Sequence, residues 1–318
     1  MAAPDLTIRP LRLGEVIDWA VALTRRHFRV LFPLMILVQV PALLLYRWHT
    51  AGLLEMLESL GRGARTVAPG RDLMVSSAVV LLVLPFLQLL ASSAVALVVA
   101  PSLEGRPPLP SLGAAVGALA SRAWPVTSAT LLQMAVLGGA PLLGLAPGLL
   151  LAWRSSGLAT RLVGFSAALL GSMGLLLAAV VRLSLAPAAA GVEALPGWRA
   201  LARSARLMSP GRELSLEQRP GLKVSLLLLA TFLLALAVNG LAGLPRAVAM
   251  IASGRGGMAM LPLGAEVGLG IFEALASAAI QPFGLVALTV FYFDRRARRE
   301  GLDLALWARR LASPGAGS

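Results

Sequence analysis

Residues 222–244 read LKVSLLLLATFLLALAVNGLAGL, and this stretch decides the fold class because its one charged side chain is Lys223, near its start. About 20 consecutive apolar residues let an α-helix cross a hydrocarbon layer about 30 Å thick. A chain in that layer must satisfy its own backbone hydrogen bonds, which a continuous helix does. The stretch therefore predicts a transmembrane helix.

Further long apolar stretches lie before and after this one in the sequence. Hydrophobic residues make up 58% of the chain and charged residues 14%, whereas soluble domains carry about 25% charged residues. We therefore predict an all-α membrane protein that forms one transmembrane helical domain over residues 1–318. Its six predicted spans are residues 28–46, 75–100, 124–153, 162–181, 222–244 and 267–293.

The third predicted span has the least regular sequence. It contains Gly138-Gly139-Ala140-Pro141 and Pro147-Gly148. Proline removes a backbone donor, but neighbouring helices in a bundle can satisfy the freed carbonyl groups. Two alternatives follow: one long helix, or a helix that ends near Pro141 and leaves residues 142–153 partly re-entrant.

Basic residues predict the orientation. Of the 28 Lys and Arg side chains, 20 flank one side of the predicted spans and 8 the other. Basic residues are enriched in cytoplasmic segments, so the side with 20 is predicted to face the cytoplasm. An even number of spans agrees, because it leaves both termini on that side. We expect a multi-pass protein with cytoplasmic N- and C-termini.

The net charge is +13, which in a soluble protein would suggest nucleic acid as a partner. Here the basic residues lie at the ends of apolar blocks, where topology explains them and anionic headgroups can bind them. The predicted partners are the lipid bilayer, its anionic headgroups and other membrane proteins, with no nucleic acid.

Three segments beside the spans have amphipathic helical periodicity: residues 13–28, 198–208 and 302–311. Together with the spans, they predict three hairpins, each with a cytoplasmic amphipathic helix. Such helices either lie in the membrane interface or dock on the bundle. In residues 198–208 the predicted apolar face holds Trp198, Leu201, Ala202, Ala205 and Met208. The predicted headgroup contacts are arginines in or beside the second and third segments: Arg199, Arg203, Arg206, Arg295, Arg296, Arg298 and Arg299.

Five of the six spans contain a side-chain amide. The last span in the sequence, residues 267–293, contains both an amide and a carboxylate. Two alternatives apply to these residues: hydrogen bonds between helices, or a polar site at the middle of the membrane. The carboxylate, Glu273, lies either inside the bilayer or at the level of the outer headgroups. The candidate intramembrane polar site comprises Gln39, Gln88, Gln133, Asn239, Glu273 and Gln281.

No pattern of residues indicates catalysis. The chain has no cysteine, and its two histidines, His27 and His49, are predicted on opposite sides of the membrane. Neither has a partner at the spacing that a metal site needs, and serine has no base to activate it. We expect no catalytic residue, no metal ligand and no cofactor, and we predict that the protein is not an enzyme.

The ends of the chain carry recognisable motifs. These are RPLRLGEVID at 9–18, RRHF at 25–28 and FYFDRRARREGLDL at 291–304, with Val192-Glu193 and Ala202-Arg203-Ser204 between them. Together they resemble a family of uncharacterised bacterial multi-pass proteins, labelled after the membrane domain of glycerophosphoryl diester phosphodiesterases. The resemblance implies a bacterial inner-membrane location and this architecture. It does not imply phosphodiesterase activity, because the chain lacks a soluble barrel with acidic metal ligands and catalytic histidines.

Two hypotheses for function follow. The first is a non-enzymatic integral inner-membrane protein that acts as a scaffold or as the membrane subunit of a larger complex. The alternative is a transporter or lipid-handling protein that uses the polar residues of its spans as a midplane site.

Overall fold

The computed structural model describes residues 10–61, 70–154, 157–209, 219–252 and 263–305. These residues are helical apart from short connections, and none forms a strand. The helices are α1 (Leu13–Gly61), α2 (Arg71–Leu103), α3 (Leu112–Ala120), α4 (Ala123–Arg154), α5 (Leu158–Leu183), α6 (Ala186–Glu193), α7 (Gly197–Met208), α8 (Pro220–Ala252) and α9 (Leu263–Glu300).

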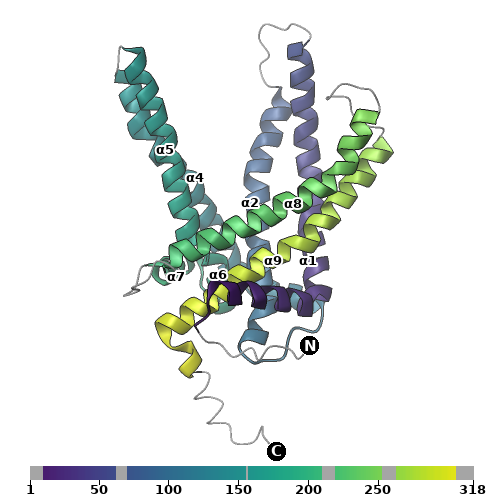
Figure 1. Ribbon diagram of the computed structural model, residues 1–318, viewed down its shortest axis with the longest axis vertical. Coiled ribbons are helices and arrows are strands. Elements are labelled where there is room, and N and C mark those ends of the chain that lie inside the picture. Colours follow the sequence, from purple (N-terminus) through teal and green to yellow (C-terminus); the bar gives the residue numbers. More distant parts are fainter. Residues whose placement is uncertain (1–9, 62–69, 155–156, 210–218, 253–262, 306–318) are drawn as a thin grey trace, which may run out of the picture.

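Among the described residues, six helical stretches are long and apolar enough to cross a membrane, which agrees with the six predicted spans and confirms the all-α prediction. They contain the six predicted spans and extend beyond them: Leu13–Leu53, Arg71–Leu103, Ala123–Arg154, Leu158–Glu193, Pro220–Pro245 and Val267–Glu300. The first predicted span and the amphipathic segment before it form one continuous helix, α1. Figure 1 shows the start of α1 running across one end of the molecule before the helix turns upward.

Helix α4 decides between the two alternatives for the third span. It is one helix of 32 residues, with Pro141 and Pro147 inside it. At 1.5 Å per residue its length is about 48 Å, enough to cross a bilayer including the headgroup layers. The re-entrant alternative for residues 142–153 is therefore wrong.

Helices α4 and α5 form a pair, which we call the wing, that stands apart from the other long helices (Figure 1). Small residues make the contact between the two helices: Gly144, Gly148 and Ala152 of α4 and Gly164, Ala168 and Gly171 of α5. A Cβ atom on Gly148 would lie 2.2 Å from the backbone nitrogen of Ala168. Such close approach of backbones replaces the hydrophobic effect as the source of helix association in lipid.

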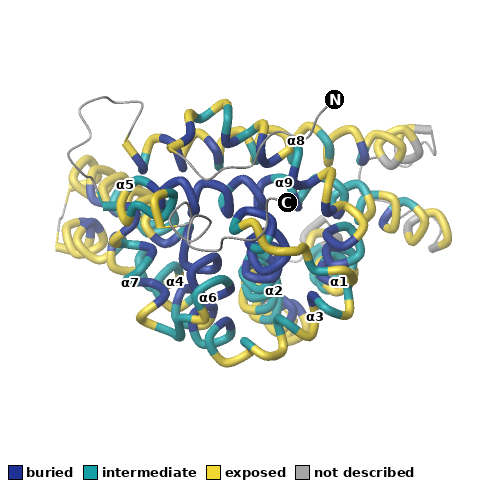
Figure 2. The backbone as a smooth tube through the Cα atoms, turned by 90° about the horizontal axis from the view of Figure 1, so that it is seen from below, coloured by how far each residue is buried: buried dark blue, intermediate teal, exposed yellow. Residues whose placement is uncertain are grey.

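The buried core lies at the end of the molecule where α6 and α7 pack, which we call the base (Figure 2). It is built from the first part of α1, the end of α2, α6, α7 and the second half of α9. Helix α9 is the most enclosed of the spans, with 56% of its most apolar window buried, against 28% for α1 and 11% for the others. The most apolar windows of the remaining spans are at least partly exposed over most of their length.

Helix α7 docks on the base. Its buried residues are Ala200, Leu201, Ser204, Leu207 and Met208, whereas Trp198 is 69% exposed. The predicted apolar face is therefore partly wrong: Trp198 lies outside it and Ser204 inside it. Ser204 Oγ donates to the carbonyl of Arg182 and accepts from the backbone nitrogen of Leu185, which satisfies this buried hydroxyl.

The glycine contact in the wing gives a first prediction. Gly148→Leu places a side chain against the backbone of α5, so it should lower the free energy of unfolding by about 1–3 kcal/mol. Gly138→Leu is the matched control, because a Cβ atom there meets nothing within 4 Å. Unfolding in detergent, followed by circular dichroism, measures both. Equal stability of the two variants would contradict the close contact.

Candidate functional site

Three polar side chains on α9 join it to three other helices. Glu273, Ser277 and Gln281 are spaced four residues apart and therefore lie on one face of α9. Glu273 pairs with Arg47 of α1 at 3.5 Å. Ser277 donates to Oδ1 of Asn239 in α8 at 2.6 Å. This face of α9 is thus tied to both α1 and α8.

Gln281 is the centre of a chain of amides. Its Nε2 donates to Oε1 of Gln88 in α2 at 2.6 Å, and its Oε1 accepts from Nε2 of Gln39 in α1. Of the predicted polar site, the structure brings these three residues together. They use one another's donors and acceptors, which suits a contact between helices.

The other predicted residues lie elsewhere. Gln133 is buried in the wing and donates to the carbonyl of Leu183 at 3.2 Å. Asn239 is exposed and meets Ser277. Glu273 pairs with Arg47, whose neighbours Tyr46 and Trp48 are 53% and 45% exposed. Exposed aromatic residues beside an arginine are typical of the membrane–water boundary. This neighbourhood favours the headgroup-level alternative for Glu273.

A cluster of charged residues holds the base together; we call it the base cluster. It joins α6, α7 and α9 through Glu193, Arg203, Tyr292, Arg296 and Glu300. Arg203 binds Glu193 at 2.9 Å and also binds Glu300. Arg296 lies 3.3 Å from both carboxylates and 5.7 Å from the Tyr292 ring centre. The Tyr292 hydroxyl donates to Glu193. Two carboxylates and two guanidinium groups balance one another.

Burial alone would lower the pKa of Arg203. Hydrogen bonds from its guanidinium to Glu300 and Glu193, together with the charge of Glu193, outweigh burial and raise that pKa above its ordinary value. The direction of this change shows that the ion pairs more than offset the cost of burying the Arg203 charge. The ion pairs with Glu193 and Glu300 make Arg203 part of the internal packing of the base.

A second group of contacts fixes the N-terminal segment. The backbone nitrogen of Leu11 donates to Oδ1 of Asp294 at 2.7 Å. Nζ of Lys223 and Nη2 of Arg298 both donate to the carbonyl of Leu11, at 3.0 and 2.7 Å. Arg298 also pairs with Asp294 at 2.9 Å. The start of the described chain is thereby bonded to α8 and α9.

The structure corrects one predicted headgroup contact. Arg295 is 1% exposed and its Nε donates to the carbonyl of Leu207, so it cannot reach lipid. The reason is that α7 packs over this part of α9. Four more of the predicted arginines bind protein groups: Arg203 and Arg296 in the base cluster, Arg298 at Asp294, and Arg299 at the carbonyl of Ser209. For the exposed Arg199 and Arg206, contact with headgroups stays a prediction.

Both histidines contact serine. His27 Nε2 lies 2.9 Å from Ser102 Oγ, and His49 Nδ1 lies 3.2 Å from Ser76 Oγ. Among the described residues, no group of three or more His, Asp or Glu side chains is placed to hold a metal ion. In both cases the imidazole connects α1 to α2.

Sequence reasoning missed several residues that carry these contacts: Glu193, Lys223, Tyr292, Asp294 and Glu300. For the three acidic residues among them, the available signal was their position inside the arginine-rich juxtamembrane motifs. Opposite charges so close together in sequence favour ion pairs over free headgroup contacts. No protein family matches the sequence, and no curated protein or solved structure matches it either. The family resemblance at the chain ends therefore stays a prediction.

The amide chain gives a second prediction. Gln39→Leu and Gln281→Leu should each destabilise the protein by about 0.5–2 kcal/mol, because each removes a hydrogen bond between helices. The double variant should lose less free energy of unfolding than the two single variants lose together, since both changes remove the same bond. The pair Gln133→Leu and Gln281→Leu is the control and should be additive. Additive costs for Gln39 and Gln281 in detergent unfolding would argue against their contact.

The base cluster gives a third prediction. Arg203→Gln leaves Glu193 and Glu300 without their main partner and should destabilise the protein by about 1.5–3 kcal/mol. Arg199→Gln removes the same charge from an exposed position of α7 and should change stability by less than about 0.5 kcal/mol. Thermal unfolding in one detergent compares them. Similar losses in both variants would mean that net charge, rather than the base cluster, governs stability.

Proposed function

We propose that this protein is a non-enzymatic membrane subunit, a scaffold that binds another membrane protein through its wing. In this proposal the spans form three hairpins in a bacterial inner membrane, and the base faces the cytoplasm with both termini. The arginine distribution supports that orientation. The six-helix architecture supports integral membrane insertion.

The observation that carries the proposal is the exposure of the wing. Its two helices use a narrow strip of small residues to contact each other, and large apolar side chains cover the rest. The most exposed along its middle include Leu142, Leu143, Leu169 and Leu170, at 67% or more. Contacts that bind the wing to other elements include Ser128 Oγ with the backbone of Gly197, and just before α4 the side chain of Arg122 binds the carbonyl of Val192. Both lie at the base.

A surface of this form suits another transmembrane helix. A wing that projects into the bilayer can pack partner helices against either face without disturbing the rest of the bundle. Such packing gains dispersion contacts that fluid lipid chains do not supply as well. The shape supports a role in assembly.

The bonding of the polar residues supports the same proposal. A transport site requires polar side chains around a shared cavity. Here Gln39, Gln88 and Gln281 bind one another, while Asn239 binds Ser277 and Glu273 binds Arg47. These groups serve contacts between helices, which favours the subunit over the transporter or lipid-handling alternative.

Photo-crosslinking in native membranes tests the proposal. A photoreactive amino acid at Leu143 or Leu169 should form a discrete protein adduct, because both lie on the exposed wing. The control position is Leu81 of α2, which is 73% exposed and outside the wing. We expect adducts from the wing positions only, together with a stable complex in mild detergent. A monomer that forms lipid adducts alone at all three positions would refute the proposal.

A further inference from the structure

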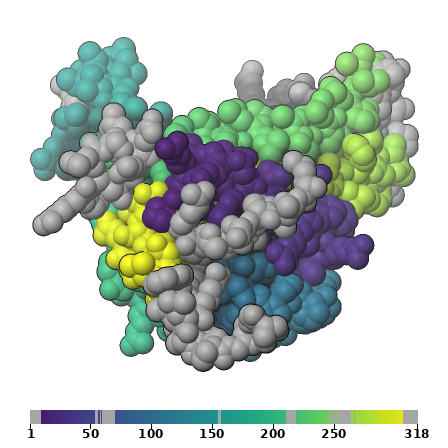
Figure 3. Space-filling model, turned by 60° about the horizontal axis from the view of Figure 1, so that its bottom comes forward, coloured from purple at the N-terminus to yellow at the C-terminus, as the bar shows by residue number. Residues whose placement is uncertain are grey.

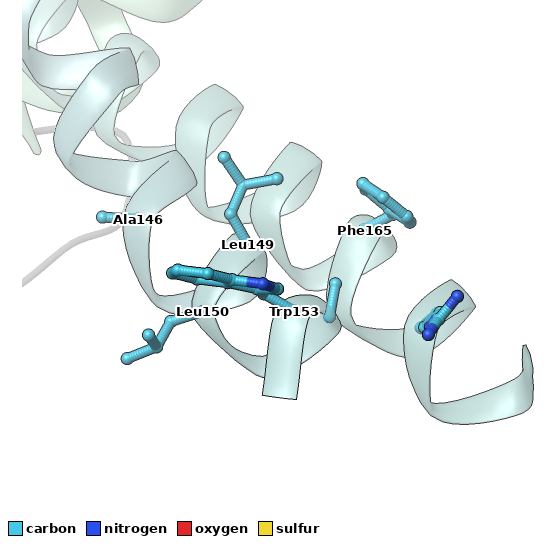
Figure 4. Close-up of a pocket in the computed structure, with 7 residues that line it drawn as sticks. Ala146, Leu149, Leu150, Trp153 and Phe165 are labelled. Carbon is cyan, nitrogen blue, oxygen red and sulfur yellow. The ribbon is translucent and has the colours of Figure 1, made fainter. Parts of the chain in front are cut away.

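The far end of the wing holds a groove of about 630 Å³ (Figure 4). It is lined by Ala146, Leu149, Leu150, Ala152 and Trp153 of α4 and by Arg161 and Phe165 of α5. None of the residues predicted for the intramembrane polar site lines it. The proposed subunit function does not use it either.

The lining combines an apolar surface with one charge. Six of the seven lining residues are apolar, and Arg161 is the cation among them. Trp153 is 86% exposed and Phe165 is 56% exposed, so both aromatic rings are accessible. In Figure 4 Leu149, Trp153 and Phe165 lie along neighbouring turns of the two helices. A ligand that fits such a lining has a long apolar part and an anionic group.

The position of the charge matches the geometry of a bilayer. Helix α4 ends at Arg154 and α5 begins at Leu158, so Trp153 and Arg161 lie within one turn of the helix ends. Tryptophan and arginine are enriched at that level, where lipid headgroups lie. Ala146 and Leu149 lie one to two turns deeper in α4, at the level of acyl chains. The groove therefore runs from the headgroup layer toward the hydrocarbon.

Arg161 has the donors that a phosphate needs. A guanidinium group carries five N–H donors, so Arg161 can bind a phosphate oxygen while it keeps contact with the protein. Charge-assisted bonds of this kind are stronger than neutral ones. An apolar partner helix would gain nothing from this charge, whereas a phospholipid matches both parts of the groove.

We infer that this groove binds one phospholipid, with the phosphate at Arg161 and an acyl chain along Leu149, Leu150 and Phe165. The site selects a phosphate-bearing lipid over a neutral one of the same chain length. It is separate from the broad faces of the wing proposed to bind protein, because it lies at the tip.

Native mass spectrometry of the purified full chain tests this inference. The detergent-washed protein is titrated with phosphatidylglycerol, and in a parallel series with diacylglycerol of the same chains. We expect one phosphatidylglycerol to bind more tightly than diacylglycerol. Arg161→Gln should weaken its binding about fivefold, the factor expected for one arginine near a membrane surface. Ala146→Phe fills the groove and should weaken both lipids.

Arg154→Gln is the matched control, because it removes the same charge at the end of α4 but does not line the groove. It should bind phosphatidylglycerol like the unaltered protein. Circular dichroism and gel filtration confirm that each variant is folded. An equal loss in the Arg154 and Arg161 variants would overturn the site in favour of general attraction to anionic lipid. Unchanged binding in both the Arg161 and Ala146 variants would also overturn it.

Discussion

In a hydrocarbon layer, leucine gains little by leaving lipid for another leucine, so helices need another reason to associate. In this protein many of the polar contacts that hold the helices together are made by α9. One face of α9 carries Glu273, Ser277 and Gln281, and these bind α1, α8 and α2. Near its end, the same helix contributes Tyr292, Asp294 and Arg296 to the contacts of the base. Removing α9 would leave α1, α2 and α8 without the partner that they share.

The wing depends on a different interaction. It contains glycine and alanine where α9 contains polar groups, and it gains contact by backbone approach rather than by hydrogen bonds. One polar link between its two helices joins Gln133 to the carbonyl of Leu183. The molecule therefore combines a polar, enclosed part around α9 with an apolar, lipid-exposed part. Because of that division, burial, charge and hydrogen bonds gather at one end of the molecule. Figure 3 shows α1, α2 and α9 packed together and the wing projecting.

The sequence predicted what depends on local composition. Runs of apolar residues are long enough to give the six spans, and amides inside those runs are easy to see. Partners were not predictable, because Gln39 and Gln281 are 242 residues apart and no local rule relates them. The continuity of α4 through Pro141 was also open. A bundle can satisfy the freed carbonyl groups, but only the arrangement of the helices shows whether it does.

The contacts of the arginines were also not predictable from local sequence. Arg295 lies in a basic run beside a span, and that pattern is typical of headgroup contact. Its burial follows from α7, an element 88 residues away that covers it and supplies the carbonyl of Leu207. In α7, Ser204 turns inward because Arg182 and Leu185 offer it bonds, whereas Trp198 turns outward. Periodicity describes the faces of one helix in isolation, so it could not predict bonds to other parts of the chain.

The spacing of contacts along the chain has a consequence for synthesis. The helices of the wing are neighbours in sequence and meet through residues 144–171, so they can pair while the ribosome is still translating the rest. Leu11, by contrast, bonds to Asp294, 283 residues later. Leu11 and Gln39 therefore do not meet their partners in α9 until the last helix is inserted, whereas His27 and His49 can contact α2 as soon as it follows α1. Any chaperone or insertase that serves this protein would meet α1 during that interval.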